Sequence, residues 1–212
     1  MTIYNEQFYD RIDEGARSSA QVIVPVVALF APIESVCDVG CGRGVWLRTF
    51  KEHGTERIVG LDGDYVNTAK LHIPRECFRP TDLTQPLPQS ERFDLVVSLE
   101  VAEHLPALCA VAFVRGLTQL SDNVLFSAAI PGQKGNGHVN EQWQSYWAAL
   151  FARHGYEVFD PIRPEVWDSP KVAFWYKQNT LVYTRDPALQ SVLRRYVPPI
   201  LNIVHPQAWS AQ

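Results

Sequence analysis

Short apolar runs alternate with segments of helical spacing along most of the chain. Four runs have the length and composition of strands: SVCDVG (35–40), RIVGLD (57–62), FDLVVSL (93–99) and NVLFSAAI (123–130). The last three are apolar at successive positions, as strands are when both faces of their sheet are covered. Helical spacing appears between the runs, near 44–53, 64–71 and 107–119. The alternation predicts βαβ units with right-handed crossovers, and therefore a parallel sheet between two layers of helices.

Further elements are predicted on both sides of this series. Residues 5–30 have helical spacing, with Pro25 as a kink or break. After the fourth strand, a glycine-rich loop leads into a helix predicted over 140–154 and ending at Gly155.

The last third of the chain is predicted to form a final pair of strands and a C-terminal tail. The strands are expected in YEVFDPI (156–162) and VAFWYKQNTLVYTR (172–185). From Pro187 onward we expect a short helix and a proline-rich segment that forms surface structure or a homodimer contact.

Composition and charge favour a soluble protein that acts on small molecules. The chain has 212 residues, of which 46% are hydrophobic and 20% charged, so one folded domain is expected. The net charge of -4 provides no global basic field for nucleic acid or anionic lipid. We therefore expect a small-molecule partner, no nucleic acid and no membrane.

The cysteines and the beginning of the sequence point to the cytoplasm. No CxxC pair and no His/Cys cluster at zinc spacing occurs, so we expect no metal site and four buried free thiols: Cys37, Cys41, Cys77 and Cys109. MTIYNEQFYD is polar and acidic where a signal peptide is basic and then apolar. The longest apolar stretch, VIVPVVALFAPI, is about half a membrane span and contains two prolines.

The segment CDVGCGRGVWL indicates nucleotide-like binding. Gly40, Gly42 and Gly44 follow a strand and precede a helix, where glycine permits a tight turn and close approach of a ligand. Their spacing is G-x-G-x-G, with Asp38 two residues before, and differs from the G-x-G-x-x-G of dinucleotide enzymes. A carboxylate at this position suits an ammonium or sulfonium ligand better than a pyrophosphate.

This loop resembles motif I of the class I S-adenosylmethionine-dependent methyltransferases, and the resemblance covers about residues 35–130. Asp62 ends the second strand, where the family binds both ribose hydroxyls, and Asp82 in RPTDLTQPLP matches the position facing the adenine amino group. FDLVVSLEVAEHLP resembles the fourth-strand segment of small-molecule members, in which E-x-x-E-H-L is frequent.

The resemblance implies a fold, a cofactor and a set of contacts. The fold is a Rossmann-like, doubly wound, mostly parallel sheet of seven strands in the order 3-2-1-4-5-7-6, with the last strand antiparallel. One domain would comprise a helical lid (1–34), the core (35–184) and a tail (185–212). S-adenosylmethionine would be the cofactor, bound by Asp38, Gly40, Cys41, Gly42, Gly44, Asp62, Gly63, Asp82, Leu83 and Glu100.

Several of the residues assigned to the cofactor site also have a purely structural explanation. The glycines would also suit a simple strand-to-helix turn, and Asp62 a solvated turn beside Gly63. Asp64 competes for the ribose role but is favoured as the N-cap of the next helix. Asp82 would also suit the start of a helix or turn.

Three candidates for catalysis lie in or near the fourth-strand segment and the glycine-rich loop. Glu100 follows the carboxyl end of its strand, where open α/β sheets bind ligands. Glu103 and His104 would also begin and orient the following helix; we favour that for Glu103 and leave His104 open between packing and the methyl-transfer site. His138 lies on a loop that reaches the same edge, as a general base, a substrate contact or a packing histidine.

The helix after this loop would combine core and polar positions. Trp143, Trp147, Leu150 and Phe151 recur on one apolar face, with Asn140 as the N-cap and Glu141 in the first turn. We expect three further side chains to contact the substrate: Gln142, Tyr146 and Tyr9. In similar enzymes, the helices bearing Tyr4, Tyr9 and Arg17 cover the cofactor; Arg17 would meet the methionine carboxylate or remain solvated.

The preferred function is methyl transfer to a hydroxyl, less favourably an amine, of a small polar metabolite, saccharide or natural-product intermediate. The run AAIPGQKGNGHVNEQWQSYW resembles a bacterial branch of small-molecule methyltransferases. The alternative is a cofactor-binding protein with a non-methylating role such as cyclisation. The glycine spacing and the lack of Tyr-x-x-x-Lys disfavour an oxidoreductase. The acidic balance and the lack of N/D-P-P-Y/F disfavour a nucleic-acid methyltransferase.

Overall fold

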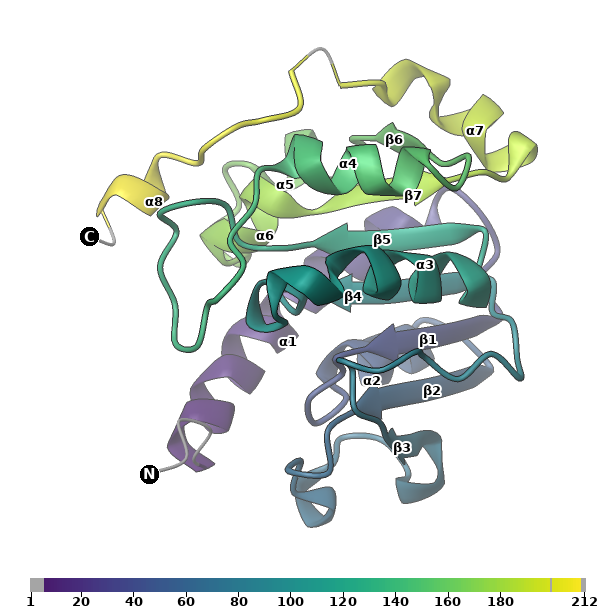
Figure 1. The fold of residues 1–212 in the computed structure, drawn as a ribbon, viewed down its shortest axis with the longest axis vertical. Coiled ribbons are helices and arrows are strands. Elements are labelled where there is room, and N and C mark those ends of the chain that lie inside the picture. The colour runs from purple at the N-terminus through teal and green to yellow at the C-terminus, as the bar shows by residue number, and fades with distance from the viewer. Residues whose placement is uncertain (1–5, 199, 211–212) are drawn as a thin grey trace.

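One mixed sheet organises the chain in the computed structural model, which describes residues 6–198 and 200–210 (Figure 1). The strands of this sheet are β1 (Ser35–Val39), β2 (Arg57–Asp62), β3 (Phe78–Pro80), β4 (Leu95–Leu99), β5 (Asn123–Ser127), β6 (Glu157–Phe159) and β7 (Leu181–Thr184). Their order is β3-β2-β1-β4-β5-β7-β6. β1 to β5 are parallel, and β7 runs antiparallel to both of its neighbours. The predicted strand order and the antiparallel last strand are confirmed.

Helices cover both faces of the sheet. The α-helices are α1 (Glu6–Ala28), α2 (Val45–Glu52), α3 (Ala110–Leu120), α4 (Gln144–Ala152), α5 (Arg163–Val166), α6 (Phe174–Asn179), α7 (Pro187–Leu193) and α8 (Gln207–Ser210). Short 3-10 turns are η1 (Thr68–Lys70), η2 (Arg75–Cys77), η3 (Ala102–His104), η4 (Ala107–Cys109) and η5 (Arg194–Tyr196). In the described residues, no helix combines the length and apolarity that crossing a bilayer requires.

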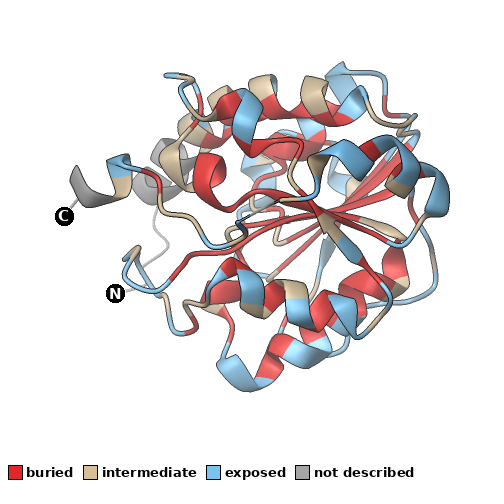
Figure 2. Cartoon of the chain, turned by 90° about the horizontal axis from the view of Figure 1, so that it is seen from above, coloured by how far each residue is buried: buried red, intermediate tan, exposed pale blue. Residues whose placement is uncertain are grey.

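Two hydrophobic cores lie on opposite faces of the sheet, as the buried positions in Figure 2 show. Alternate strand residues enter different cores: Val96 packs with α3 and α4, whereas Val97 packs with α1 and α2. Both residues are fully buried. This explains why the central strands are apolar at successive positions.

Residues 64–71 do not form the predicted α-helix. The segment is a loop that contains only the turn η1. The Asn67 side chain accepts a hydrogen bond from the Ala69 amide at 3.1 Å, and the Asn67 backbone is extended. This local side-chain contact replaces helical hydrogen bonding and makes Asn67, and not Asp64, the cap.

The helix predicted over 140–154 is shorter at its start. α4 begins at Gln144 with Trp143 as the N-cap, so Asn140 is not the cap. Asn140 is buried instead, and its side chain reaches the Ala102 carbonyl at 3.4 Å. The predicted apolar face holds for Trp147, Leu150 and Phe151, but Trp143 is 40% exposed because it precedes the helix.

The stretch 172–185 is only partly a strand. Its first half forms α6 and its second half forms β7. The aromatic sequence FWYKQN suggested a strand, but Tyr176 packs edge-on against Trp46 of α2, at a ring distance of 5.2 Å. Such tertiary contacts override a weak local strand propensity.

The two tryptophans of the α4 region provide a test of the core. We expect Trp147→Ala to lower the free energy of unfolding by about 3–5 kcal/mol, because it empties a fully packed site. Trp143→Ala should cost about 1 kcal/mol or less, since this side chain is largely exposed. Urea denaturation followed by circular dichroism measures both; similar losses in the two variants would contradict this core assignment.

Candidate active site

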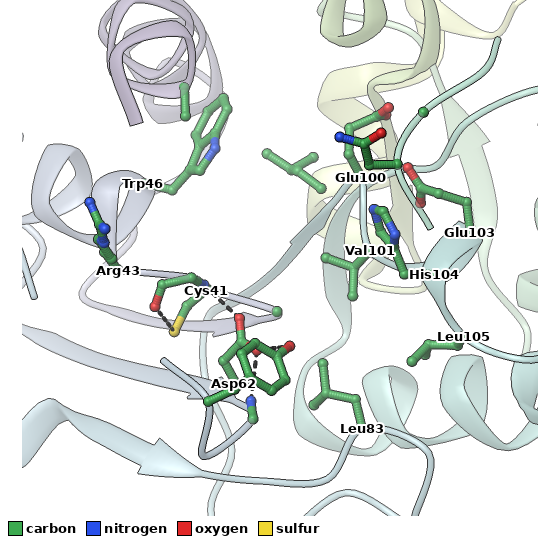
Figure 3. Close-up of a pocket in the computed structure, with 18 of the residues that line it drawn as sticks. Cys41, Arg43, Trp46, Asp62, Leu83, Glu100, Val101, Glu103, His104 and Leu105 are labelled. Carbon is green, nitrogen blue, oxygen red and sulfur yellow. Dashed lines mark hydrogen bonds between the residues drawn. The ribbon is translucent and has the colours of Figure 1, made fainter. Parts of the chain in front are cut away.

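A cavity of about 960 Å³ opens at the carboxyl edge of the parallel strands. It is lined by the motif loop after β1, the ends of β2 and β4, and residues near Asp82 (Figure 3). Residues of the loop 133–138 also line it. Ligands of open α/β sheets bind at this edge, where the strand order reverses between β1 and β4. The volume accommodates a nucleotide-sized cofactor together with a small acceptor.

The motif loop requires glycine for steric reasons. Gly40 has φ +87°, and a Cβ there would lie 2.3 Å from a methyl carbon of Val101. Gly44 has φ +84°, and its Cβ would lie 2.8 Å from Ile73. Gly40, Cys41 and Gly42 line the cavity, whereas Gly44 is not among the lining residues and begins α2 as its N-cap.

Asp38 lies beneath this loop and not on the cavity wall. The side chain is buried, and its Oδ2 atom has no hydrogen-bond partner. Burial, reinforced by the negative charge of Asp62, raises the pKa of Asp38 well above its usual value. Asp38 is therefore not among the residues that face the cavity.

Asp62 lies in the cavity at the end of β2, as predicted. Its carboxylate accepts hydrogen bonds from the Gly42 amide at 2.6 Å, the Gly63 amide at 2.7 Å and the Tyr65 hydroxyl at 2.6 Å. Burial nevertheless raises the pKa of Asp62. The contacts fix the carboxylate between the motif loop and Gly63. Asp64 also lines the cavity.

Asp82 lies on the exposed part of the cavity wall, next to the buried Leu83. Its Oδ1 accepts hydrogen bonds from the Thr84 amide at 2.9 Å and the Thr84 hydroxyl at 2.7 Å, which lower the pKa of Asp82. The aspartate thus shapes a turn and faces the cavity at the same time.

Glu100 has a left-handed backbone, with φ +57°. This conformation is costly for a non-glycine residue and concentrates at functional sites. Its carboxylate accepts hydrogen bonds from Gln133 at 2.9 Å and Asn179 at 3.1 Å. Burial raises its pKa despite these contacts. The amides hold the carboxylate on the cavity wall.

Sequence reasoning missed Gln133 and Asn179 as partners of Glu100. The signal was present for Asn179, because an antiparallel β7 beside β5 begins at the carboxyl edge of the parallel strands. Residues just before such a strand must lie near the site. Gln178 connects the two amides, since its Nε2 atom donates to Gln133 at 3.0 Å and to Asn179 at 3.0 Å.

The loop after β5 brings His138 to the cavity, beside His104. The two imidazole rings are 4.9 Å apart and meet edge to face. His138 Nδ1 is 2.9 Å from Glu141 Oε1. Burial and the neighbouring His138 lower the pKa of His104 to about 4, so this ring is neutral near pH 7.

Glu141 closes the loop and does not lie in the first turn of α4. Besides His138, it accepts hydrogen bonds from the Gly132 amide at 2.7 Å and the Lys134 amide at 3.0 Å. The loop amides are local donors that replace the helix dipole predicted as its partner. His138 is therefore held by a carboxylate that the loop itself positions.

Two of the three predicted substrate residues do not line the cavity. Gln142 and Tyr146 are not among the residues lining the cavity; Gln142 donates to Asn140 at 3.1 Å, and Tyr146 packs against Trp147. Tyr4 and the side chain of Tyr9 lie outside the described residues. Arg17 is exposed and also absent from the lining. The lining residues that sequence reasoning missed include Arg43, Trp46, Trp175 and Tyr176.

α1 contacts the motif loop through a charged side chain. Asp13 lines the cavity and lies 3.2 Å from Arg43 of that loop and 3.0 Å from His72. This interaction joins the N-terminal helix to the motif loop beside the cavity.

Comparisons with known proteins agree with this geometry. A family described as a methyltransferase domain matches residues 21–161. A ubiquinone biosynthesis O-methyltransferase of Neisseria meningitidis is 34% identical over 107 residues. That match covers 45% of this chain and 43% of the relative, so the chain spans less than half of the relative's length.

Two solved structures share the fold at low identity. Magnesium protoporphyrin IX methyltransferase from Synechocystis PCC 6803, solved with bound S-adenosylhomocysteine, is 19% identical with a TM-score of 0.60, covering 88% of this chain and 90% of that chain. Streptomyces venezuelae DesVI is 16% identical with a TM-score of 0.62, covering 85% and 96%. Because the family match spans more than half of the sequence, the chain belongs to the class I S-adenosylmethionine-dependent methyltransferases.

Proposed function

We propose that this protein transfers the methyl group of S-adenosylmethionine to a hydroxyl group of a small polar acceptor, such as a saccharide or a natural-product intermediate. One observation carries the proposal: a single cavity is lined at one side by Asp62 and at the other by Glu100 and His104 (Figure 3). His138 also lines it, next to His104. The first side suits a nucleoside, and the second suits an acceptor that must lose a proton.

The cofactor side fits S-adenosylmethionine. Asp62 would accept hydrogen bonds from the ribose hydroxyls, which its position at the end of β2 in the cavity supports, and the glycine loop would allow close approach of the cofactor. Asp82 and Leu83 would contact the adenine. When bound, the cofactor supplies a methyl group on a sulfonium, which the buried carboxylates Asp38 and Glu100 favour electrostatically.

The side of the cavity proposed for the methyl acceptor contains a group that can take up a proton. His138 is oriented by Glu141, as a general base is by its partner, and the neutral His104 stands beside it. A hydroxyl needs such a base, since it is a poor nucleophile before its proton leaves. The O-methyltransferase name of the Neisseria relative supports an oxygen acceptor.

We further propose that the enzyme works in a reducing compartment, the cytoplasm, and acts without nucleic acid. The four cysteines are free thiols in the structure, and three of them are buried.

The ribose assignment is tested by cofactor affinity. Asp62→Ala should weaken S-adenosylhomocysteine binding about 10- to 100-fold, because two hydrogen bonds to a charged acceptor are lost. Asp64→Ala, in the same loop, is the matched control and should change affinity little. Isothermal titration calorimetry measures both; an unchanged affinity in Asp62→Ala would reject the assignment.

The role of His138 is tested by turnover. His138→Ala should lower the rate of S-adenosylhomocysteine formation about 100-fold, with nearly unchanged cofactor affinity. The control variant is His53→Ala, which should keep the wild-type turnover because His53 is exposed and does not line the cavity. The assay uses a panel of hydroxyl-bearing acceptors with product mass spectrometry. Equal turnover in wild type and His138→Ala would remove this role, and turnover without a methyl gain in the product would favour the non-methylating alternative.

A further inference from the structure

Three side chains of the kinds that bind metal ions converge on the acceptor side of the cavity. Glu103 and His104 come from η3, and His138 comes from the loop after β5. One ligand atom from each lies within 4.8 Å of the others. The backbone holds them together, because the Val139 and Asn140 amides donate to the Glu103 carbonyl at 2.8 and 3.0 Å.

Glu103 is the unusual member of this group. It lines the cavity wall yet is 0% exposed, and neither of its carboxylate oxygens has a hydrogen-bond partner. Buried polar atoms are normally hydrogen-bonded, so a carboxylate with two unpartnered oxygens is an exception that a bound cation would satisfy.

Both histidines have one ring nitrogen oriented by a neighbour. His138 Nδ1 contacts Glu141, which leaves Nε2 for another partner. His104 hydrogen-bonds with the Gly137 backbone, and because this bond favours the protonated ring, the imidazole is the donor. Metal-binding histidines are typically oriented in this way, through the nitrogen that does not bind the metal.

We propose that Glu103, His104 and His138 bind one divalent first-row cation, of the class of Zn²⁺ or Mn²⁺. Two imidazoles and one carboxylate suit such ions better than the all-oxygen sites of Ca²⁺. Bonds of about 2.1 Å place ligand atoms up to about 4.2 Å apart, so a small rotation of the side chains closes the site. Gly135 and Gly137 shortly precede His138 in the chain and allow this adjustment.

The sequence pattern did not reveal this site. The expectation of no metal rested on the spacing of cysteine and histidine, which addresses thiolate sites. Glu103 and His104 are adjacent, whereas His138 is distant in the sequence and joins them only through the folded loop.

The proposed cation deepens the proposed function, on which its role rests. Three protein ligands leave open positions at which an acceptor hydroxyl can bind, and the cation lowers the pKa of that hydroxyl. The O–H bond breaks and its proton leaves to solvent. The oxygen then forms a bond to the methyl carbon as the carbon–sulfur bond breaks, and S-adenosylhomocysteine leaves with that electron pair. His138 would act here as a ligand through Nε2 rather than as the base.

Metal titration of the purified full chain tests the site independently of turnover. After dialysis against EDTA, Co²⁺ is added and its visible absorption followed, with calorimetric titrations of Zn²⁺, Mn²⁺ and Mg²⁺ in parallel. We expect one bound Co²⁺ per chain. Glu103→Gln, which keeps the side-chain volume, and His138→Ala should each weaken Co²⁺ binding at least about 100-fold, since loss of a mere supporting residue already costs 10- to 100-fold.

Two further variants keep the test decisive. In Gly135→Ala, the new Cβ would lie 2.1 Å from His138 Nε2, so the ring must move while all three ligands remain; Co²⁺ affinity should fall about tenfold. Asp62→Asn is the matched control on the cofactor side and should leave Co²⁺ affinity unchanged. Thermal unfolding confirms that each variant is folded.

The outcomes separate this inference from the proposed function. Failure of all four cations to bind the wild type, or equal Co²⁺ affinity in wild type, Glu103→Gln and His138→Ala, would overturn the metal site. S-adenosylhomocysteine binding is measured on the same samples. Co²⁺ binding that depends on Glu103, without cofactor binding, would support the metal site and reject the proposed function.

Discussion

Two backbone hydrogen bonds, from the Val139 and Asn140 amides to the Glu103 carbonyl, hold the acceptor side of the cavity together. They join the loop after β5 to the turn after β4, which are elements of neighbouring parallel strands. His138 directly precedes this junction and is therefore brought to His104. The loop is glycine-rich and would have many conformations alone, so the junction is what gives it a defined position.

A network of side-chain amides likewise holds Glu100 in a defined position. The glutamate occupies a strained left-handed backbone position and is held by Gln133 and Asn179, which Gln178 connects. Gln144 extends the network into α4, donating to the Ile203 carbonyl at 3.1 Å. The network thus links the loop after β5, α6 and the C-terminal segment. Strain at Glu100 persists because surrounding contacts determine its position.

The sequence was most informative where the sheet itself dictates position. The strand order was implied by the resemblance to a known family, whereas the placement of Asp62 and Glu100 at strand ends follows from parallel strands whose carboxyl ends share one edge. It was least informative where side chains form hydrogen bonds with the backbone of nearby loops. Asn140 and Glu141 looked like helix-start residues, yet Asn140 reaches the Ala102 carbonyl and Glu141 binds loop amides. Such choices depend on tertiary contacts that no local pattern encodes.

The charges of the cavity support one electrostatic interpretation. Asp38, Asp62, Glu100 and Glu103 are carboxyl groups in or beneath the site, and burial raises the pKa of each. A buried carboxylate without a cationic partner is destabilising, so a site with four of them favours positively charged ligands. In the proposed function, a sulfonium would lie near the two aspartates and Glu100. Glu103 lies on the histidine side, and neither of its carboxylate oxygens has a hydrogen-bond partner. A buried carboxylate without partners, next to two imidazoles, is the geometric reason to propose a second cation between it and the two histidines.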